Sequence, residues 1–248
     1  MRKMIGILYV FHGSQKNEKN QAAMDFIQQL ETRMDPTFYQ ATAFLENHSD
    51  TIPSVAEKMI KHGVTKIIVV PVLLFAAKHA LVDIPAELDV VKERHPAVQF
   101  VQTETFGSKK GSRQVLLERF QEAAVTYPDD ELVGILVAHG TKQTEQPQEV
   151  LVEIAEEIQQ QVGFSIAAVS LKGKENYLEE IKKQVSNHQR PVIVPFFLFD
   201  GHLITIMKNK LKETFPTTDF IMMPTLEFDP RILNDLEQIV KEAVTCIQ

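Results

Sequence analysis

Hydrophobic and polar positions in this chain follow two alternating patterns. Short runs of β-branched and other apolar residues are typical of buried strands, and longer segments with one apolar stripe are typical of amphipathic helices. The expected strands are residues 4–11, 38–44, 66–75, 98–101, 132–138, 165–171, 191–199 and 219–223. The expected helices are residues 21–34, 52–62, 80–94, 112–126, 148–162, 177–186, 203–214 and 230–247. This alternation predicts parallel sheets that are covered by helices on both faces.

The pattern occurs twice, and the two halves share sequence. Residues 6–14 read GILYVFHGS and residues 134–141 read GILVAHGT. The run PVLLF that precedes His79 corresponds to the run PFFLF that precedes His202. We therefore predict an α/β fold of two tandem similar domains, residues 1–127 and 128–248, each with a parallel four-stranded sheet flanked by helices.

Three side chains that can bind a metal ion follow the ends of expected strands in the first half: His12, Glu46 and His79. Ligands bind outside the carboxyl ends of the strands in an open parallel sheet. Neutral imidazole suits divalent iron, cobalt, nickel and zinc, and a carboxylate can complete such a site. Each residue alone also has a structural explanation, as a strand end, a helix start or a solvated carboxylate. Their common position favours a catalytic metal site formed by all three.

The remaining histidines of interest are expected at the surface: His48, His62, His95 and His188. No Gly-x-Gly-x-x-Gly, Walker A or Gly-x-Ser-x-Gly motif is present in the sequence, which disfavours nucleotide-dependent chemistry and a hydrolase triad. A histidine phosphatase would need arginine before His12-Gly13, where Phe11 stands.

Composition narrows the function classes further. The net charge of −7 argues against broad binding of nucleic acids, which requires a basic surface. Cys246 is the sole cysteine, so the chain's own cysteines form no disulfide, zinc–thiolate or iron–sulfur site. We find no signal peptide and no apolar run of the ~20 residues that a membrane helix needs, and we expect a cytoplasmic protein that binds no membrane.

Three segments resemble the class II tetrapyrrole chelatases, the sirohydrochlorin ferrochelatase and cobaltochelatase family. They are FHGS at residues 11–14, FLE at 44–46 and PVLLFAAKHALVDIP at 71–85, the last being the most specific. The resemblance covers the whole chain, because long members of the family are tandem duplications. It implies two domains that face each other across a cleft for the macrocycle. It also implies that His12 and His79 act on the metal and the pyrrole protons, with Glu46 assisting.

The resemblance also suggests which residues bind the substrate, a polycarboxylate. Lys78 stands where many members have a small residue; it either alters the approach of the loop to the macrocycle or adds a cation for a substrate carboxylate. We expect further contacts from Ser14 and Arg113, and from His139 and His202 of the second copy.

The second copy is expected to be degenerate, because Lys172 aligns with Glu46 and the Asp-Ile-Pro after His79 has no counterpart. The predicted activity is a lyase-type insertion of Fe2+ into sirohydrochlorin to form sirohaem. Cobalt insertion in a cobalamin pathway, or a non-enzymatic metal or tetrapyrrole carrier, remain alternatives. No permanently bound cofactor is expected, because the divalent metal (Fe2+, or Co2+ or Ni2+) is a substrate. A fused pair of domains is expected to be a monomer.

Overall fold

The computed structural model describes residues 4–174, 176–185 and 189–247. These residues form two compact units. The first unit combines the chain up to Lys109 with the C-terminal segment from Pro230, and the second comprises Lys110–Asp229. No helix within the described ranges combines the length and the apolar character needed to cross a bilayer.

The first unit is a parallel sheet with the strand order β2-β1-β3-β4. Its strands are β1 (Met4–Phe11), β2 (Tyr39–Phe44), β3 (Val64–Pro71) and β4 (Gln99–Gln102). Its helices are α1 (Asn17–Glu31), α2 (Ile52–Lys61), the π-helical turn η1 (His79–Asp83), α3 (Ile84–Arg94) and α8 (Pro230–Ile247).

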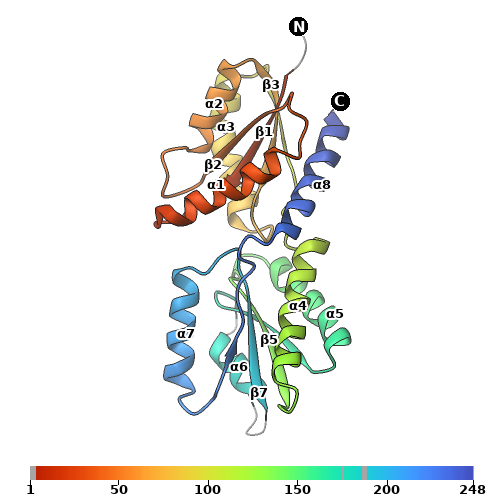
Figure 1. Cartoon of the computed structure of the whole chain (residues 1–248). Coiled ribbons are helices and arrows are strands. Elements are labelled where there is room, and N and C mark those ends of the chain that lie inside the picture. The colour runs from red at the N-terminus through yellow and green to blue at the C-terminus, as the bar shows by residue number, and fades with distance from the viewer. Residues whose placement is uncertain (1–3, 175, 186–188, 248) are drawn as a thin grey trace. The chain divides into compact units, whose positions relative to one another are not determined.

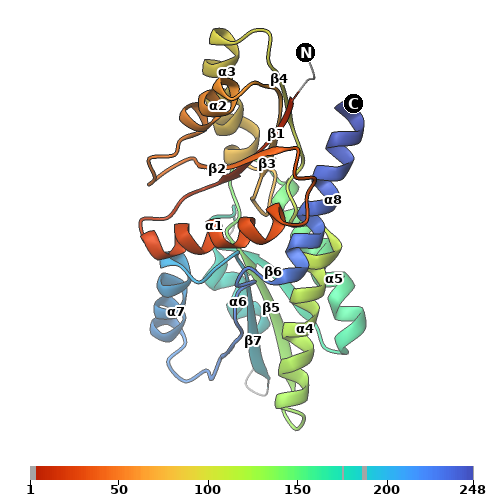
Figure 2. The same ribbon diagram turned by 45° about the horizontal axis from the view of Figure 1, so that its top comes forward.

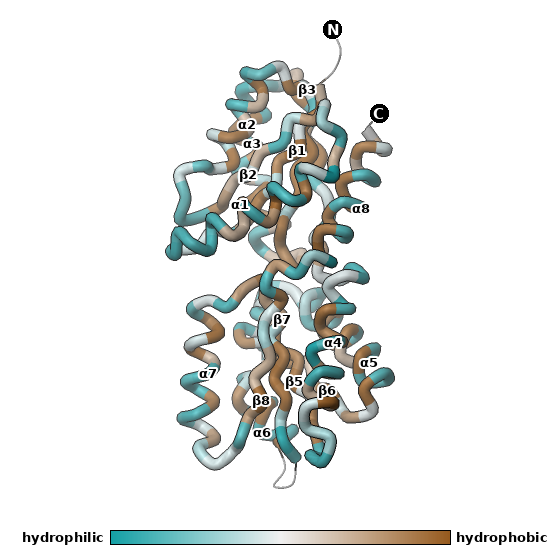
Figure 3. The backbone as a smooth tube through the Cα atoms, in the orientation of Figure 1, coloured by the Kyte–Doolittle hydropathy of each residue, from teal (hydrophilic) through white to brown (hydrophobic). Residues whose placement is uncertain are grey.

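Helices cover both faces of this sheet. α2 and α3 share one hydrophobic core with alternate residues of β1 and β3, whereas α1 and α8 contact each other on the opposite side. Both faces of β1 are therefore buried, and every residue from Ile7 to Phe11 is at most 3% exposed. Figure 3 shows the central strand as a hydrophobic segment, while the helices alternate between hydrophobic and hydrophilic residues along their turns. This is the burial that continuous apolar strands and amphipathic helices predict.

The second unit repeats this topology, with the strand order β6-β5-β7-β8, all parallel. Its strands are β5 (Leu132–Ala138), β6 (Ile166–Ser170), β7 (Arg190–Phe196) and β8 (Ile221–Met222). Its helices are α4 (Lys110–Thr126), α5 (Gln146–Val162), α6 (Tyr177–Gln184) and α7 (His202–Thr214). The predicted α/β fold with two similar four-stranded parallel sheets is confirmed.

The compact units differ from the predicted domains 1–127 and 128–248 in their last helix. α4, which ends the first sequence copy, packs against α5 and β7 of the second unit. α8, which ends the second copy, packs against α1 and β3 of the first unit (Figures 1 and 2). The two helices are equivalent in the repeat, so exchanging them leaves each sheet covered on both faces.

Two predicted strands extend at least three residues too far at their carboxyl ends. β3 ends at Pro71 rather than residue 75, and β7 ends at Phe196 rather than residue 199. Beyond β3 the carbonyls of Leu73 and Leu74 accept hydrogen bonds from Phe106 and Gly107, which lie outside the strands of the sheet. An apolar run continues there, but its backbone pairs with a loop, and hydropathy alone does not distinguish the two arrangements.

Candidate active site

The ends of β1 and β3 bring two histidines together. These neighbouring strands flank the point where the chain connections diverge to opposite sides of the sheet, which is where open α/β sheets bind ligands. His12 directly follows β1, and His79 begins the π-helical turn after β3. Their rings meet edge to face, with centroids 4.5 Å apart and an interplanar angle of 83°. The expectation that these strand ends converge is therefore met by the two imidazoles.

Gly13 fixes the position of Glu46 relative to His12. The backbone N–H of Glu46 donates to the His12 carbonyl over 2.9 Å. Gly13 has φ +91°, and a Cβ at this position would lie 1.8 Å from the Glu46 carbonyl oxygen. Glycine is thus required both for the backbone conformation and for the close approach of the β2 end.

In both imidazoles, Nδ1 lies within hydrogen-bonding distance of an oxygen that acts only as a hydrogen-bond acceptor. Nδ1 of His12 lies 2.9 Å from the Gly13 carbonyl oxygen, and Nδ1 of His79 lies 2.7 Å from Oδ2 of Asp83. A neutral imidazole that donates from Nδ1 to such an oxygen presents the lone pair of Nε2. Partial burial raises the pKa of Asp83, but hydrogen bonds from Lys78 and His79 outweigh this effect and hold the pKa below its ordinary value. Asp83 is therefore ionised and acts as an acceptor.

An open pocket of about 440 Å³ adjoins these residues. Its wall is formed by Leu45, Glu46, Lys78, His79, Asp83, Ala86, Glu87 and Val90. Glu46 and His79 therefore share this pocket. Among the residues that the structure describes, no three His, Cys, Asp or Glu side chains are grouped as a ready-made metal site. The arrangement offers two imidazoles in contact, with the carboxylate of Glu46 in the wall of the same pocket as His79.

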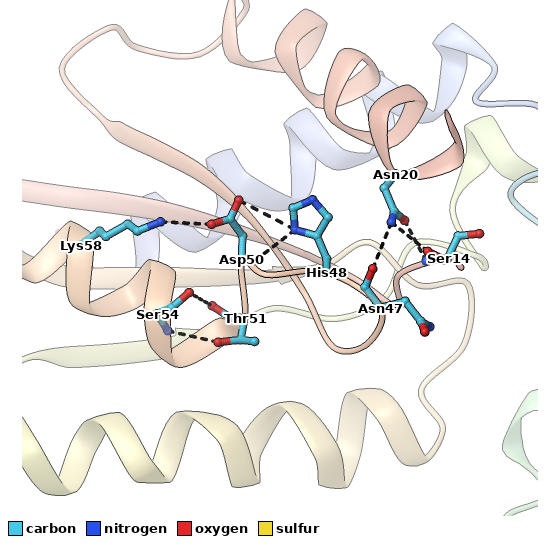
Figure 4. Close-up of polar contacts among 8 residues, drawn as sticks. All are labelled: Ser14, Asn20, Asn47, His48, Asp50, Thr51, Ser54 and Lys58. Atoms are coloured by element: carbon cyan, nitrogen blue, oxygen red, sulfur yellow. Dashed lines mark hydrogen bonds and ion pairs between the residues drawn. The ribbon is translucent and has the colours of Figure 1, made fainter. Parts of the chain in front are cut away.

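Ser14 belongs to a buried clamp between two loops (Figure 4). Asn20, which is 3% exposed, accepts from the Ser14 N–H over 2.8 Å and donates to the carbonyls of Ser14 and Asn47. The Ser14 hydroxyl accepts from the Lys16 N–H. Asn20 therefore ties the loop after His12 to the loop after β2. This role was missed in the sequence, because an asparagine near a helix start is usually exposed.

His48 is half-buried, so the prediction that it lies at the surface is wrong. Its ring packs against Phe44 with centroids 4.3 Å apart and planes tilted by 40°, and Nδ1 accepts from the Asp50 N–H over 3.1 Å. Figure 4 shows this ring beside Asp50, which also pairs with Lys58 at 3.1 Å. His48 thus supports the turn that leads into α2.

Of the other histidines with the same prediction, His62 is exposed as expected. His95 directly follows α3 and is half-buried, so the surface prediction is wrong for it as well; its backbone N–H donates to the Val91 carbonyl. His188 lies outside the described residues.

Lys78 and Arg113, the two cations that were predicted to bind the substrate, have different surroundings. Lys78 is exposed at the pocket, with Nζ 3.3 Å from Oδ1 of Asp83. Arg113 lies on α4 in the second unit, where its guanidinium pairs with Glu153 at 2.7 Å and with Glu157. The role of Arg113 in substrate binding stays a prediction, since these two carboxylates already give its side chain a structural role.

The second unit repeats the backbone of this site without its full chemistry. Gly140 has φ +68°, and the Lys172 N–H donates to the His139 carbonyl over 2.8 Å. Lys172 therefore occupies the place of Glu46, as the sequence alignment of the copies predicts. His202 begins the regular helix α7 without a π-helical turn, and within the described part of the chain it makes no ring contact with His139.

Comparison with known proteins agrees with a duplicated α/β fold. The chain belongs to the CbiX family, whose model matches residues 6–123 and again residues 133–243. The two matches correspond to the two sequence copies, and they confirm the resemblance to class II chelatases.

Two relatives and one solved structure show how far the similarity extends. Sirohydrochlorin ferrochelatase of Priestia megaterium is 32% identical over 245 residues, which cover 96% of this chain and 90% of that protein. Sirohydrochlorin cobaltochelatase of the same organism is 24% identical over 249 residues, covering 97% and 80%. The structure of SirB from Bacillus subtilis with Fe3+ superposes with a TM-score of 0.84 at 25% identity, and the match covers 96% of this chain and 95% of that chain.

Proposed function

We propose that this protein is a sirohydrochlorin chelatase that inserts Fe2+ into sirohydrochlorin to form sirohaem. The contact between the imidazole rings of His12 and His79 is the observation that carries the proposal. The relative named sirohydrochlorin ferrochelatase supports the choice of substrate and metal. The metal ion is a substrate of this reaction, and no permanently bound cofactor is required.

The reaction replaces two pyrrole protons by one divalent metal. Two N–H bonds break, the nitrogens bind the metal, and two protons leave. Imidazole is a suitable ligand for divalent iron or cobalt, and it also exchanges protons near neutral pH. We assign metal binding to Nε2 of His12 and His79, with Glu46 as the third ligand. The same groups accept the pyrrole protons as the metal passes to the macrocycle.

The peripheral carboxylates of the substrate need cations and hydrogen-bond donors. Lys78 is the best-placed candidate, because its ammonium group is exposed at the pocket that also contains Glu46 and His79. Contacts from Ser14, Arg113, His139 and His202 remain part of the proposal, as do a monomeric state and a cytoplasmic location.

Cobalt is the second candidate metal, since a relative is named sirohydrochlorin cobaltochelatase. Imidazole and carboxylate accept Fe2+ and Co2+ alike, so the ligand set does not choose between them.

Anaerobic incubation with sirohydrochlorin and either metal tests the proposal by the change in absorbance as the metal enters the macrocycle. We expect acceleration over the spontaneous rate with both metals, and an excess of the iron product when Fe2+ and Co2+ are equimolar. An excess of the cobalt product would reverse the metal assignment. Tight binding of the metal or of sirohydrochlorin without acceleration of metal insertion would contradict an enzymatic function and indicate a non-enzymatic carrier.

A further inference from the structure

We infer that Asp83 is a positioning residue, which holds His79 in the Nδ1–H tautomer and aims its Nε2 at the metal. The inference rests on the proposed function, in which His79 binds the metal ion. Oδ2 of Asp83 accepts from Nδ1 of His79 over 2.7 Å, and its other oxygen, Oδ1, lies 3.3 Å from Nζ of Lys78. One carboxylate therefore connects the metal-binding imidazole to the candidate cation for the substrate.

His79 and Asp83 are the first and last residues of the π-helical turn η1. The Ile84 N–H donates to the His79 carbonyl, five residues back, which is the π-helical pattern. Pro85 has no N–H with which to continue the hydrogen bonding, and the Ala80 carbonyl accepts instead from Nε2 of Gln102 on β4 over 2.6 Å. The hydrogen bond from Gln102 thus holds η1 in place from the neighbouring strand. His79 and Asp83 lie on the same face of η1.

The orientation of the carboxylate follows from its two partners. Oδ2 of Asp83 faces Nδ1 of His79 at 2.7 Å, and Oδ1 faces Nζ of Lys78 at 3.3 Å. A carboxylate held in this way accepts the hydrogen bond from Nδ1. The Nδ1 proton is then fixed, and the lone pair of Nε2 is free for a metal. Carboxylate partners of this kind orient metal-binding histidines and raise their basicity.

The second copy provides an internal comparison. Four residues after His202 the chain has Ile206, which is 41% exposed and has no hydrogen-bonding group. α7 is a regular helix from His202 onward, so neither the turn nor the carboxylate is repeated. The positioning pair is thus a feature of the first copy, which is also the copy that carries Glu46.

A long-range ¹H–¹⁵N spectrum of the metal-free protein tests the tautomer directly and needs no turnover. It is recorded at about pH 8.5, where an ordinary imidazole is neutral. The signal of His79 is assigned by its loss in His79→Ala. We expect the Nδ1–H form in the wild type and a shift to the Nε2–H form in Asp83→Ala and Asp83→Ile. An Nε2–H form of His79 in the wild type, or an unchanged tautomer in both variants, would overturn the inference.

Titration with Co2+ alone, followed by its visible absorption, measures the consequence for metal binding. We expect Asp83→Ala to raise the Kd for Co2+ by roughly 10- to 100-fold. Asp83→Glu should recover part of the loss, because it restores the carboxylate. The control is Asp89→Ala on α3, the helix that follows η1; this variant removes an exposed ion pair with Lys92 and should leave the Kd unchanged. Equal Kd values for Asp83→Ala and Asp89→Ala would contradict the inference.

Steady-state kinetics separate Asp83 from Lys78. If Asp83 acts through His79, Asp83→Ala raises the KM for the metal, whereas Lys78→Met raises the KM for sirohydrochlorin. An increase only in the KM for sirohydrochlorin in both variants would assign Asp83 to substrate binding and overturn the positioning role. If the wild type inserts no metal, the proposed function fails, while the tautomer and the Co2+ titration still decide the present inference.

Discussion

Replacing Gly13 by alanine should displace the segment that follows β2, which contains Glu46, from His12. Gly13 lies at φ +91°, and its new Cβ would be 1.8 Å from the Glu46 carbonyl oxygen. Ordinary contacts of this kind are longer than 3.0 Å, so one of the two backbone segments must move by more than an ångström. The hydrogen bond from the Glu46 N–H to the His12 carbonyl would be strained or lost.

Gly63 provides a matched control for the cost of the backbone conformation. It has φ +94°, and a Cβ there would meet nothing within 4 Å. Gly63→Ala should therefore cost only the left-handed conformation, about 1–2 kcal/mol of the free energy of unfolding. Gly13→Ala adds a steric term of about 1–3 kcal/mol, typical of overpacking, for a total of about 2–5 kcal/mol.

Urea unfolding of both variants measures this difference, and the chelatase assay measures its effect on the site. We expect Gly13→Ala to be less stable than Gly63→Ala and to lose most metal insertion, because Glu46 and His12 no longer keep their relative positions. Gly63→Ala should retain wild-type activity. Equal stabilities of the two variants, or an active Gly13→Ala, would refute the close approach as the reason for this glycine.

Two further predictions concern stability. Asn20→Ala leaves the Ser14 N–H without its partner and should cost about 1–3 kcal/mol in urea unfolding, whereas the exposed neighbour Gln21→Ala should stay within about 0.5 kcal/mol of wild type. Equal losses of stability in the two variants would contradict the role of Asn20 in holding the two loops together. Burial raises the pKa of Glu31, so its protonated form stabilises the fold at low pH, and this contribution is lost as the pH rises through the folded pKa. Glu31→Gln should therefore increase the free energy of unfolding at about pH 7 and have no effect at about pH 3; the opposite dependence on pH would refute the assignment.

The sequence was sufficient to predict the fold class and the proximity of His12 and His79. Both follow from the order of strands and helices, because parallel strands end at one edge of the sheet. Runs such as β1 and β5 are buried on both faces, so their apolar pattern marks their bounds well. The correspondence of Lys172 with Glu46 could also be read from the repeat, and the matching hydrogen bonds to His139 and His12 bear it out.

Three features could not be predicted, for different physical reasons. The exchange of α4 and α8 between the two units cannot be recognised in the sequence, because either amphipathic helix can cover either sheet. The π-helical turn η1 is too short for its periodicity to differ measurably from that of an α-helix. The clamp formed by Asn20 depends on two loops that are distant in sequence. The spacing of four residues between His79 and Asp83 was a usable signal for the positioning pair, since such residues share a helix face.

The decisive measurement is the rate of Fe2+ insertion into sirohydrochlorin by the wild type, His12→Ala and His139→Ala. The two histidines are equivalent in the repeat, and each Nδ1 lies within 2.9 Å of the carbonyl oxygen of the next glycine. We expect His12→Ala to lose about 100-fold or more of the rate, as for a group that takes part in proton transfer, while His139→Ala keeps most of the activity. Equal losses in the two variants, or a wild type no faster than the spontaneous reaction, would show that the chemistry does not depend on the histidine pair of the first copy.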